Sequence, residues 1–278
     1  MFMLAQELKK EEVKKLNGDY IFSPKFDGER GMVFIENGRI SKIINRRGKN
    51  ILKQFIEFKD LTFNFNNGVI DSEIIVVVNG RIWGDFSKGI ALRTHLENER
   101  EILERSKELR AKIMAFDILN LNGEDLKFKP LIKRIEILEQ NIKDNDLIEV
   151  VKSYENFDEI WKIVEQYGLE GVIAKNKQVA YESVRSRFWL KIKNWKEKVI
   201  GFDSYDIVNG EKFYKGITLT NKEGVRCACL GKKSDEVREI IDREGKIDVV
   251  VQYLEKTSEK GHRFITFKEV VKNGKRIS

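Results

Sequence analysis

The segment Lys25 to Arg30, with the sequence KFDGER, combines side chains that can act on a phosphate group. A lysine amine is protonated at neutral pH, but burial or nearby positive charge lowers its pKa and frees the lone pair. Attack of such an amine on an α-phosphate gives a phosphoramide and releases pyrophosphate, and Arg30 is placed to hold the nucleotide. The alternative is a surface lysine paired with Asp27 on an ordinary turn, and the hexapeptide alone favours that alternative.

Two acidic residues lie on the apolar run VIDSEIIVVV. Strand alternation puts Asp71 and Glu73 on one face and Ser72 on the other. Carboxylates on a buried face require a cation or a hydroxyl partner, so Glu73 is a candidate for binding a ribose hydroxyl or a metal-bound water. Solvated acids at an exposed strand end fit the pattern equally well.

Two further strands carry single residues of interest. Glu170 precedes the apolar run GVIAK, and carboxylate oxygens are the ligands that Mg²⁺ prefers. The alternative is an acid in the turn that follows Gly168. Phe116, in the run AFDIL, is placed at a strand end where it can stack on a purine, although a core phenylalanine is the better reading of this residue alone.

Lys191 and Lys193, in the run RFWLKIK, share one face of a strand whose other face carries Leu190 and Ile192. Two lysines that point the same way repel each other unless an anion lies between them. A triphosphate supplies such an anion. A solvated basic strand face remains the alternative.

Strands and helices must bring these segments together, and local sequence patterns predict where those elements lie. Asn37-Gly38 between GMVFIE and RISKIIN predicts a hairpin, and Asn79-Gly80 predicts a second turn. The other predicted strands lie at about 68–78, 113–119, 171–174 and 187–194. The predicted helices are an N-terminal amphipathic one, 94–112 with Thr94 as its cap, one starting at Pro130, and 157–167 ending at Gly168.

After about Trp195 the pattern changes to short strands around a single helix. Strands are predicted at about 199–207, 213–220, 225–230 and 247–254, and the helix at 234–243. About 80 residues of this kind suit a small barrel of the oligonucleotide-binding type. Cys227 and Cys229 are predicted to be small side chains packed on one strand face in a reducing compartment. The sequence therefore indicates an α+β chain of two domains, 1–195 and 196–278.

The composition favours a polyanionic partner. Of 278 residues 35% are charged, with a formal net charge of +7, and 41% are hydrophobic, enough to build cores. No stretch approaches the roughly 20 apolar residues of a membrane span. The N-terminus lacks the apolar region of a secretory signal. We therefore expect a cytoplasmic protein, or one in the host cytoplasm if the source is viral.

Taken in order, 25–30, 71–73, 116–117, 170–175 and 189–193 resemble the motifs of the covalent nucleotidyltransferase superfamily, which comprises ATP-dependent polynucleotide ligases and mRNA capping enzymes. The chain is most similar to small, two-domain ATP-dependent DNA ligases. The segment NRRGK (45–49) resembles the S-R-x-G-K segment of ligases, and AFDILNLNGEDL and PLIKR are close to the ligase versions of the central strand and the helix after it. The resemblance implies an ATP-grasp-like nucleotidyltransferase domain of mainly antiparallel sheets with flanking helices, followed by a C-terminal OB-fold barrel.

The resemblance also implies a mechanism and residue roles. Three phosphoryl transfers seal a 5′-phosphate/3′-hydroxyl nick in duplex DNA, through AMP linked to Lys25 and then a DNA-adenylate, with ATP and Mg²⁺ or Mn²⁺. The protein is expected to be a monomer that closes around the nicked duplex. The implied roles are nucleotide binding by Ser23, Asp27, Arg30, Glu73, Phe116, Lys191 and Lys193, metal binding by Glu73 and Glu170, and DNA contact by Arg46 and Arg263.

Two departures from the family pattern have consequences. Ser72 replaces the glycine of the usual D-G-E, which is harmless if its side chain faces inward. The usual C-terminal R-x-D-K is absent, and Lys268, Lys272 or Lys275 would have to replace it as point charges. The alternative functions are an RNA ligase, a capping-type nucleotidyltransferase and an inactive nucleic-acid-binding homologue.

Overall fold

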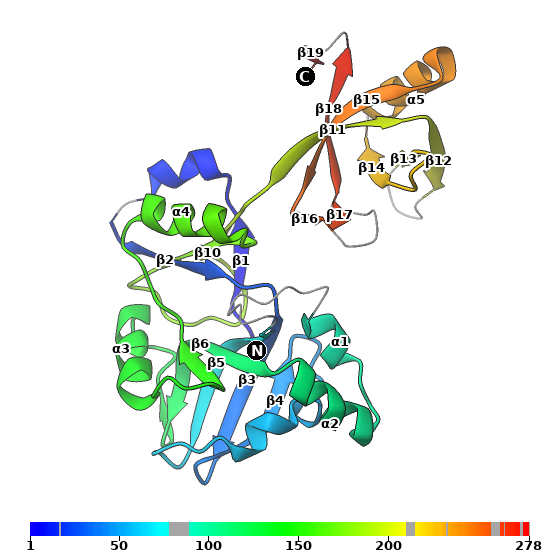
Figure 1. Ribbon diagram of the computed structural model, residues 1–278. Coiled ribbons are helices and arrows are strands. Elements are labelled where there is room, and N and C mark those ends of the chain that lie inside the picture. The colour runs from blue at the N-terminus through cyan, green and yellow to red at the C-terminus, as the bar shows by residue number, and fades with distance from the viewer. Residues whose placement is uncertain are drawn as a thin grey trace. The chain divides into compact units, whose positions relative to one another are not determined.

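The computed structural model describes residues 1–16, 18–77, 89–209, 215–231, 233–256, 262–263, 265–272 and 275–277. The chain divides into two compact units, Met1–Lys193 and Asn194–Ser278 (Figure 1). Among the described residues, no helix combines the length and the apolar character that crossing a membrane requires.

The larger sheet of the first unit is antiparallel except where its last strand joins. Its strands are, in order, β4 (Arg39–Asn45), β3 (Glu29–Glu36), β5 (Gly68–Val76), β6 (Ala111–Leu121) and β7 (Glu124–Asp125), and β8 (Ile148–Val150) pairs in parallel with β6. The predicted hairpin is confirmed, since Asn37 and Gly38 join β3 to β4 with φ of 52° and 70°. The sheet buries one face on a core that includes Ile70 and Ile74.

The second sheet of this unit carries the strands that end at the predicted site. Its order is β1 (Leu4–Glu7), β10 (Arg185–Lys193), β9 (Gly171–Asn176) and β2 (Tyr20–Lys25), with only the β1–β10 pair parallel. Helix α4 (Phe157–Tyr167) packs against it through Ile160 and Val164 (Figure 1). The predicted end of α4 is confirmed, because Gly168 has the left-handed φ of 63°.

Two helix predictions in this unit are wrong. The N-terminal segment forms β1 and the 3₁₀ helix η1 (Lys10–Lys15), because Phe2 and Met3 are buried and the strand pairs with β10. The predicted helix 94–112 is divided into α1 (Ala91–Thr94) and α2 (Glu99–Glu108), and the cap of α2 is Asn98. The remaining helices are η2 (Leu52–Gln54), η3 (Ile56–Asp60) and α3 (Leu131–Asn141), which follows Pro130 as predicted. The predicted turn at Asn79-Gly80 lies outside the described residues.

The second unit is built around one mixed sheet and one helix. The sheet order is β11 (Lys196–Phe202), β15 (Ile247–Tyr253), β18 (Thr266–Lys272), β14 (Arg226–Leu230), β13 (Lys215–Thr220) and β12 (Ser204–Asn209), with β19 (Lys275–Ile277) on β18 and a separate pair β16 (Glu255–Lys256) and β17 (His262–Arg263). The predicted strand 199–207 is thus two strands, β11 and β12. Helix α5 (Lys233–Glu244) packs Val237 and Ile241 into a core that contains Cys227 and Cys229, as the sequence predicted for the two cysteines. The OB-fold assignment stays a prediction.

Candidate active site

Lys25 and Glu170 meet where β2 ends and β9 begins. The antiparallel register pairs Lys25 with Gly171, so the neighbouring Glu170 carboxylate reaches the lysine, and Lys25 Nζ lies 2.5 Å from Glu170 Oε2. The side chains are 22% and 11% exposed, so both remain partly accessible from solvent. Gly171 permits this arrangement, because a Cβ at its φ of 151° would lie 2.0 Å from the Ile192 carbonyl oxygen.

Glu73 faces the same cluster from β5. The backbone N–H of Gly28 donates to Glu73 Oε1 at 3.2 Å, and a Cβ on Gly28 would lie 2.2 Å from the Ile74 carbonyl oxygen. Burial raises the pKa of Glu73 to about 7, with Lys25 and Arg30 opposing the shift and Glu170 adding to it. Lys25, Glu73 and Glu170 therefore form one electrostatically coupled group.

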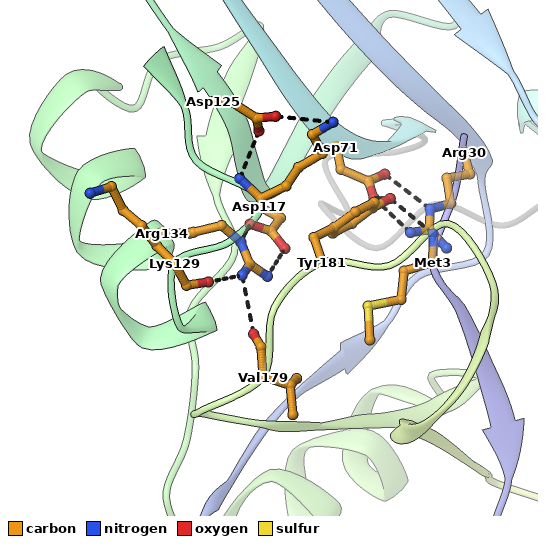
Figure 2. A network of polar contacts seen from close by, with 10 residues as sticks. Met3, Arg30, Asp71, Asp117, Asp125, Lys129, Arg134, Val179 and Tyr181 are labelled. Carbon is orange, nitrogen blue, oxygen red and sulfur yellow. Dashed lines mark hydrogen bonds and ion pairs between the residues drawn. The ribbon is translucent and has the colours of Figure 1, made fainter.

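Arg30 is held by a buried network (Figure 2). Its Nε and Nη2 donate to the two oxygens of Asp71 at 3.0 and 2.7 Å, and the Tyr181 hydroxyl donates to Asp71 Oδ2 at 2.6 Å. The Met3 backbone N–H in turn donates to the Tyr181 oxygen at 3.0 Å. Burial opposes the charged form of Arg30, yet Asp71 raises the pKa of Arg30 above its ordinary value. Asp71 thus fixes one edge of the guanidinium.

Phe116 lies half-buried on β6, and two cations lie close to its ring. The Arg30 guanidinium is 5.3 Å from its ring centroid and the Lys175 ammonium is 4.1 Å from it. Lys175 is also 4.5 Å from the centroid of Trp189. Burial lowers the pKa of Lys175 to about 8, while Asp117 and Asp71 oppose the shift. Lys175 was not among the predicted site residues, although strand alternation separates it from Val172 and Ala174, which face the core.

A second buried ion pair joins Arg134 of α3 to Asp117 of β6, the residue that follows Phe116 (Figure 2). Arg134 donates from Nε and Nη2 to the two oxygens of Asp117, each at 2.8 Å, and both side chains are inaccessible to solvent. Arg134 Nη1 also donates to the carbonyl oxygens of Lys129 and Val179. The pair therefore anchors α3 to β6 and to the segment before β10. The sequence contained both residues in ligase-like segments but no sign that they pair.

Lys191 and Lys193 lie on one face of β10, and the opposite face carries Leu190 and Ile192 in the core, as predicted. The anion beside these two lysines is a carboxylate of the protein itself, that of Glu7. Oε2 of Glu7, on β1, is 3.7 Å from Lys191 Nζ and 3.4 Å from Lys193 Nζ. Glu7 was not predicted to lie at the site.

Ser23, Asp27 and Ser72, which the sequence also pointed to, all lie on or next to strands of the first unit. Ser23 is buried on β2, and Asp27 follows in the turn before β3. Ser72 is buried and its hydroxyl donates to the Gly31 carbonyl oxygen at 2.9 Å, so its side chain faces inward as the replacement of glycine requires.

Arg46 is exposed on the turn that follows β4. Asn45 shapes that turn, since its Oδ1 accepts from the backbone N–H groups of Arg47 and Lys49 at 3.0 and 2.9 Å. Asn45 Nδ2 donates to Glu29 Oε1 at 2.8 Å, which ties the turn to the segment that carries Lys25.

The C-terminal candidates are only partly described. Arg263 belongs to β17, and its side chain lies outside the description. Lys268 and Arg276 both pair with Glu197 on β11. Lys268 is thus engaged within its own unit.

The donor set at the site suits a divalent metal that is completed by a ligand. Within the described residues, no three His, Cys, Asp or Glu side chains gather into a full metal site. Glu73 and Glu170 offer carboxylate oxygens, and Mg²⁺ commonly takes one or two carboxylates together with water and substrate phosphates. The chemistry of these residues therefore fits Mg²⁺ or Mn²⁺ bound together with a phosphate-containing substrate.

Relatives of the chain are DNA ligases. The DNA ligase of Sulfolobus acidocaldarius is 30% identical over 76% of this chain and 37% of its own length. The DNA ligase of Sulfophobococcus zilligii is 30% identical over 87% of this chain and 41% of its own length. The bifunctional non-homologous end joining protein LigD of Bacillus subtilis is 25% identical over 83% and 41% of the two chains. The chain thus spans about two-fifths of the length of these relatives.

Solved structures share the fold. A Lig E DNA ligase structure superposes with a TM-score of 0.70 at 19% identity, covering 97% of this chain and 98% of the other. A mycobacterial DNA ligase D complexed with ATP gives 0.59 at 19% identity, covering 98% and 95%. The likeness shows a nucleotidyltransferase-type ligase fold with mixed sheets. Residues 2–193, which make up most of the chain, match the family described as the ATP dependent DNA ligase domain. The chain therefore belongs to this family.

Proposed function

We propose that the protein is an ATP-dependent DNA ligase that seals 5′-phosphate/3′-hydroxyl nicks in duplex DNA through a lysyl-AMP and a DNA-adenylate. The supporting observation is Lys25, whose side chain is partly exposed and whose Nζ lies 2.5 Å from Glu170 Oε2, in the part of the chain that matches the ligase family. Residues 1–195 act as the adenylyltransferase domain and 196–278 as an OB-fold domain. The protein works in the cytoplasm as a monomer that closes around the nicked duplex.

In the first transfer, the deprotonated Lys25 nitrogen bonds to the α-phosphorus of ATP. The bond from that phosphorus to the oxygen that bridges it to the β-phosphate breaks, and pyrophosphate leaves. The nitrogen, which is positively charged after the attack, then loses one proton to solvent. Positioning and charge neutralisation dominate such a step. The proposed nucleotide contacts are the adenine with Phe116 and Ser23, the ribose with Arg30 and Glu73, the phosphates with Lys191 and Lys193, and a supporting contact from Asp27.

Glu73 and Glu170 are proposed to hold Mg²⁺ or Mn²⁺, which supplies charge neutralisation on the phosphates when bound. In the second transfer, an oxygen of the DNA 5′-phosphate bonds to the AMP phosphorus and the bond to Lys25 breaks. In the third, the 3′-oxygen bonds to the 5′-phosphorus, its proton is lost, and AMP leaves. Arg46 and Arg263 contact the DNA, and the Asn45 hydrogen bonds hold Arg46 on its turn.

The test uses ATP labelled at the α-phosphate. Wild-type protein, freed of any bound AMP with pyrophosphate, is incubated with labelled ATP and Mg²⁺, resolved on a denaturing gel, and then given nicked duplex DNA. We expect a labelled band that disappears as the nick is sealed. Lys25→Ala should give no band, whereas Lys15→Ala, at an exposed lysine that pairs with Glu12, should label normally. Labelling retained in Lys25→Ala would refute the role of Lys25.

The same assay separates the alternatives. Labelling by GTP in place of ATP would indicate a capping-type nucleotidyltransferase, and joining of RNA ends without sealing of nicked DNA would indicate an RNA ligase. Absence of a band with wild-type protein would favour an inactive binding homologue that lacks the usual C-terminal R-x-D-K.

A further inference from the structure

Glu7 is directed at the two lysines by strand pairing. β1 runs parallel to β10 with Glu7 opposite Lys191, and the Leu8 backbone N–H donates to the Lys191 carbonyl oxygen at 3.0 Å. This register puts the Glu7 side chain on the face of β10 that carries Lys191 and Lys193. One carboxylate oxygen thereby contacts both ammonium groups, at 3.7 and 3.4 Å.

The lysines that Glu7 contacts belong to a larger group of cations. The pKa of Lys191 is lowered by burial and by the neighbouring charge of Lys193, and Lys25 and Arg185 add to the shift. Glu7 opposes it. Mutual repulsion in this group makes an anion at the position of Glu7 favourable whether the anion belongs to the chain or to a ligand.

The Glu7 contacts are longer than those of the more buried ion pairs of the same unit. Charge-assisted N–H···O bonds are usually about 2.7–2.9 Å long. Lys25 meets Glu170 at 2.5 Å and Lys112 meets Glu149 at 2.6 Å, whereas both Glu7 distances exceed 3.3 Å. The Glu7 side chain is also 49% exposed. It can therefore rotate away from the lysines while the backbone pairing of β1 with β10 stays intact.

We propose that Glu7 is a displaceable internal counterion, which occupies the place of a nucleotide phosphate between Lys191 and Lys193 until a nucleoside triphosphate displaces it. The inference rests on the proposed function, because it takes these lysines as the polyphosphate-binding residues. Glu7 forms and breaks no covalent bond. It weakens the binding of ATP and of pyrophosphate, and so favours the departure of pyrophosphate after the first transfer.

The test compares four proteins in the rate of lysyl-AMP formation against ATP concentration. Glu7→Gln removes the charge and should lower the half-saturating ATP concentration roughly 2- to 5-fold, the range of an exposed ion pair. The maximal rate should stay within about twofold of wild type. Glu7→Asp keeps the charge on a shorter side chain and should lie closer to Glu7→Gln than to wild type. Glu11→Gln, which removes one charge from the exposed surface of η1, should match wild type.

Pyrophosphate binding, measured by calorimetry on the same proteins, supplies a readout that needs no transfer. Glu7→Gln should bind pyrophosphate more tightly by the same factor, and its thermal midpoint should fall slightly because the lysines lose their counterion. Equal affinities in Glu7→Gln and wild type, or an equal gain in Glu11→Gln, would overturn the role of Glu7 while lysyl-AMP formation still upheld the proposed function. If wild-type protein formed no lysyl-AMP, the proposed function would fail and calorimetry alone would decide the role of Glu7.

Discussion

At the scale of single residues, Lys175 is the least expected feature of the site. It is only 5% exposed, and its ammonium lies against the rings of Phe116 and Trp189. Ring faces stabilise a cation less than water does unless other charges help, and here the carboxylates of Asp71 and Asp117 act on it. Burial nevertheless dominates and the pKa of Lys175 falls to about 8. The folded protein therefore holds this proton less tightly than the unfolded chain does.

That shift predicts a pH dependence of stability. Between about pH 8 and the ordinary lysine pKa near 10.4, the unfolded chain binds more protons than the folded protein, so stability rises with pH. Relative to Lys175→Met, wild-type protein should gain roughly 2 kcal/mol in free energy of unfolding between pH 7 and pH 9.5. Urea denaturation of both proteins at each pH measures the difference, and the variant cancels the titration of the other lysines. A constant difference would show that Lys175 is not desolvated in solution.

The sequence predicted the residues that belong to contiguous motifs but not the partners that hold them. Lys25, Glu73 and Lys191 can be recognised because each belongs to a short motif of consecutive residues. Tyr181 and Glu7 are not, since each meets a partner more than 100 positions away. Glu7 does so through the pairing of β1 with β10, and Tyr181 does so from the segment between β9 and β10. Such contacts depend on which strands pair and in which register, and a local stretch of sequence does not specify this.

At the scale of elements, the turn after β4 shows how one buried side chain displays several basic ones. Asn45 is 7% exposed and makes three side-chain hydrogen bonds, two to turn N–H groups and one to Glu29. Gly48 adopts the left-handed φ of 77° that the turn needs. A serine at this position would be shorter and would have no amide nitrogen, so the link to Glu29 depends on the asparagine.

Asn45→Ala should affect the DNA-dependent transfer and spare the first one. Without its hydrogen bonds the turn samples other conformations, and transfer of AMP from Lys25 to a nick should slow about tenfold, equal to about 1.4 kcal/mol. Because Arg46 is proposed to contact DNA and not ATP, lysyl-AMP formation should stay within about twofold of wild type. Single-turnover assays on preformed lysyl-AMP measure the second step, and Asn45→Ser should recover part of it. Equal slowing of both steps would indicate a general structural defect.

Element prediction succeeded where the signals were local and failed where they were not. Asn37-Gly38 and the glycines that end α4 and α5 specify their turns by backbone conformation alone. The N-terminal segment has the composition of an amphipathic helix, yet it forms β1, because pairing with β10 and burial of Met3 outweigh helix propensity. That competition involves residues about 180 positions away, which a local pattern does not contain.

At the scale of the molecule, each of the two units has its own hydrophobic core and its own net positive charge. The buried cluster with Ile200 and Val249 belongs wholly to the second unit, and the other clusters belong to the first. Lys25, Glu73, Glu170, Lys191 and Lys193 all lie in the first unit. By sequence, residues 1–193 carry a net charge of +3, and the 85 residues of the second unit carry +4. The residues proposed to bind the nucleotide therefore lie in the first unit, while the smaller second unit carries more than half of the net positive charge.

This division predicts the behaviour of the fragment 1–193. With its own cores it should unfold cooperatively, and with the lysine group intact it should bind pyrophosphate within about threefold of the full chain. Its affinity for duplex DNA should fall and so should the dependence of that affinity on salt, because each lost phosphate contact lowers the slope of log affinity against log salt by about 0.9. Thermal unfolding, calorimetry and fluorescence anisotropy between low and moderate salt measure the three quantities. An unchanged salt slope would mean that the first unit alone supplies the phosphate contacts, and Arg46 on its turn would then become the first residue to replace.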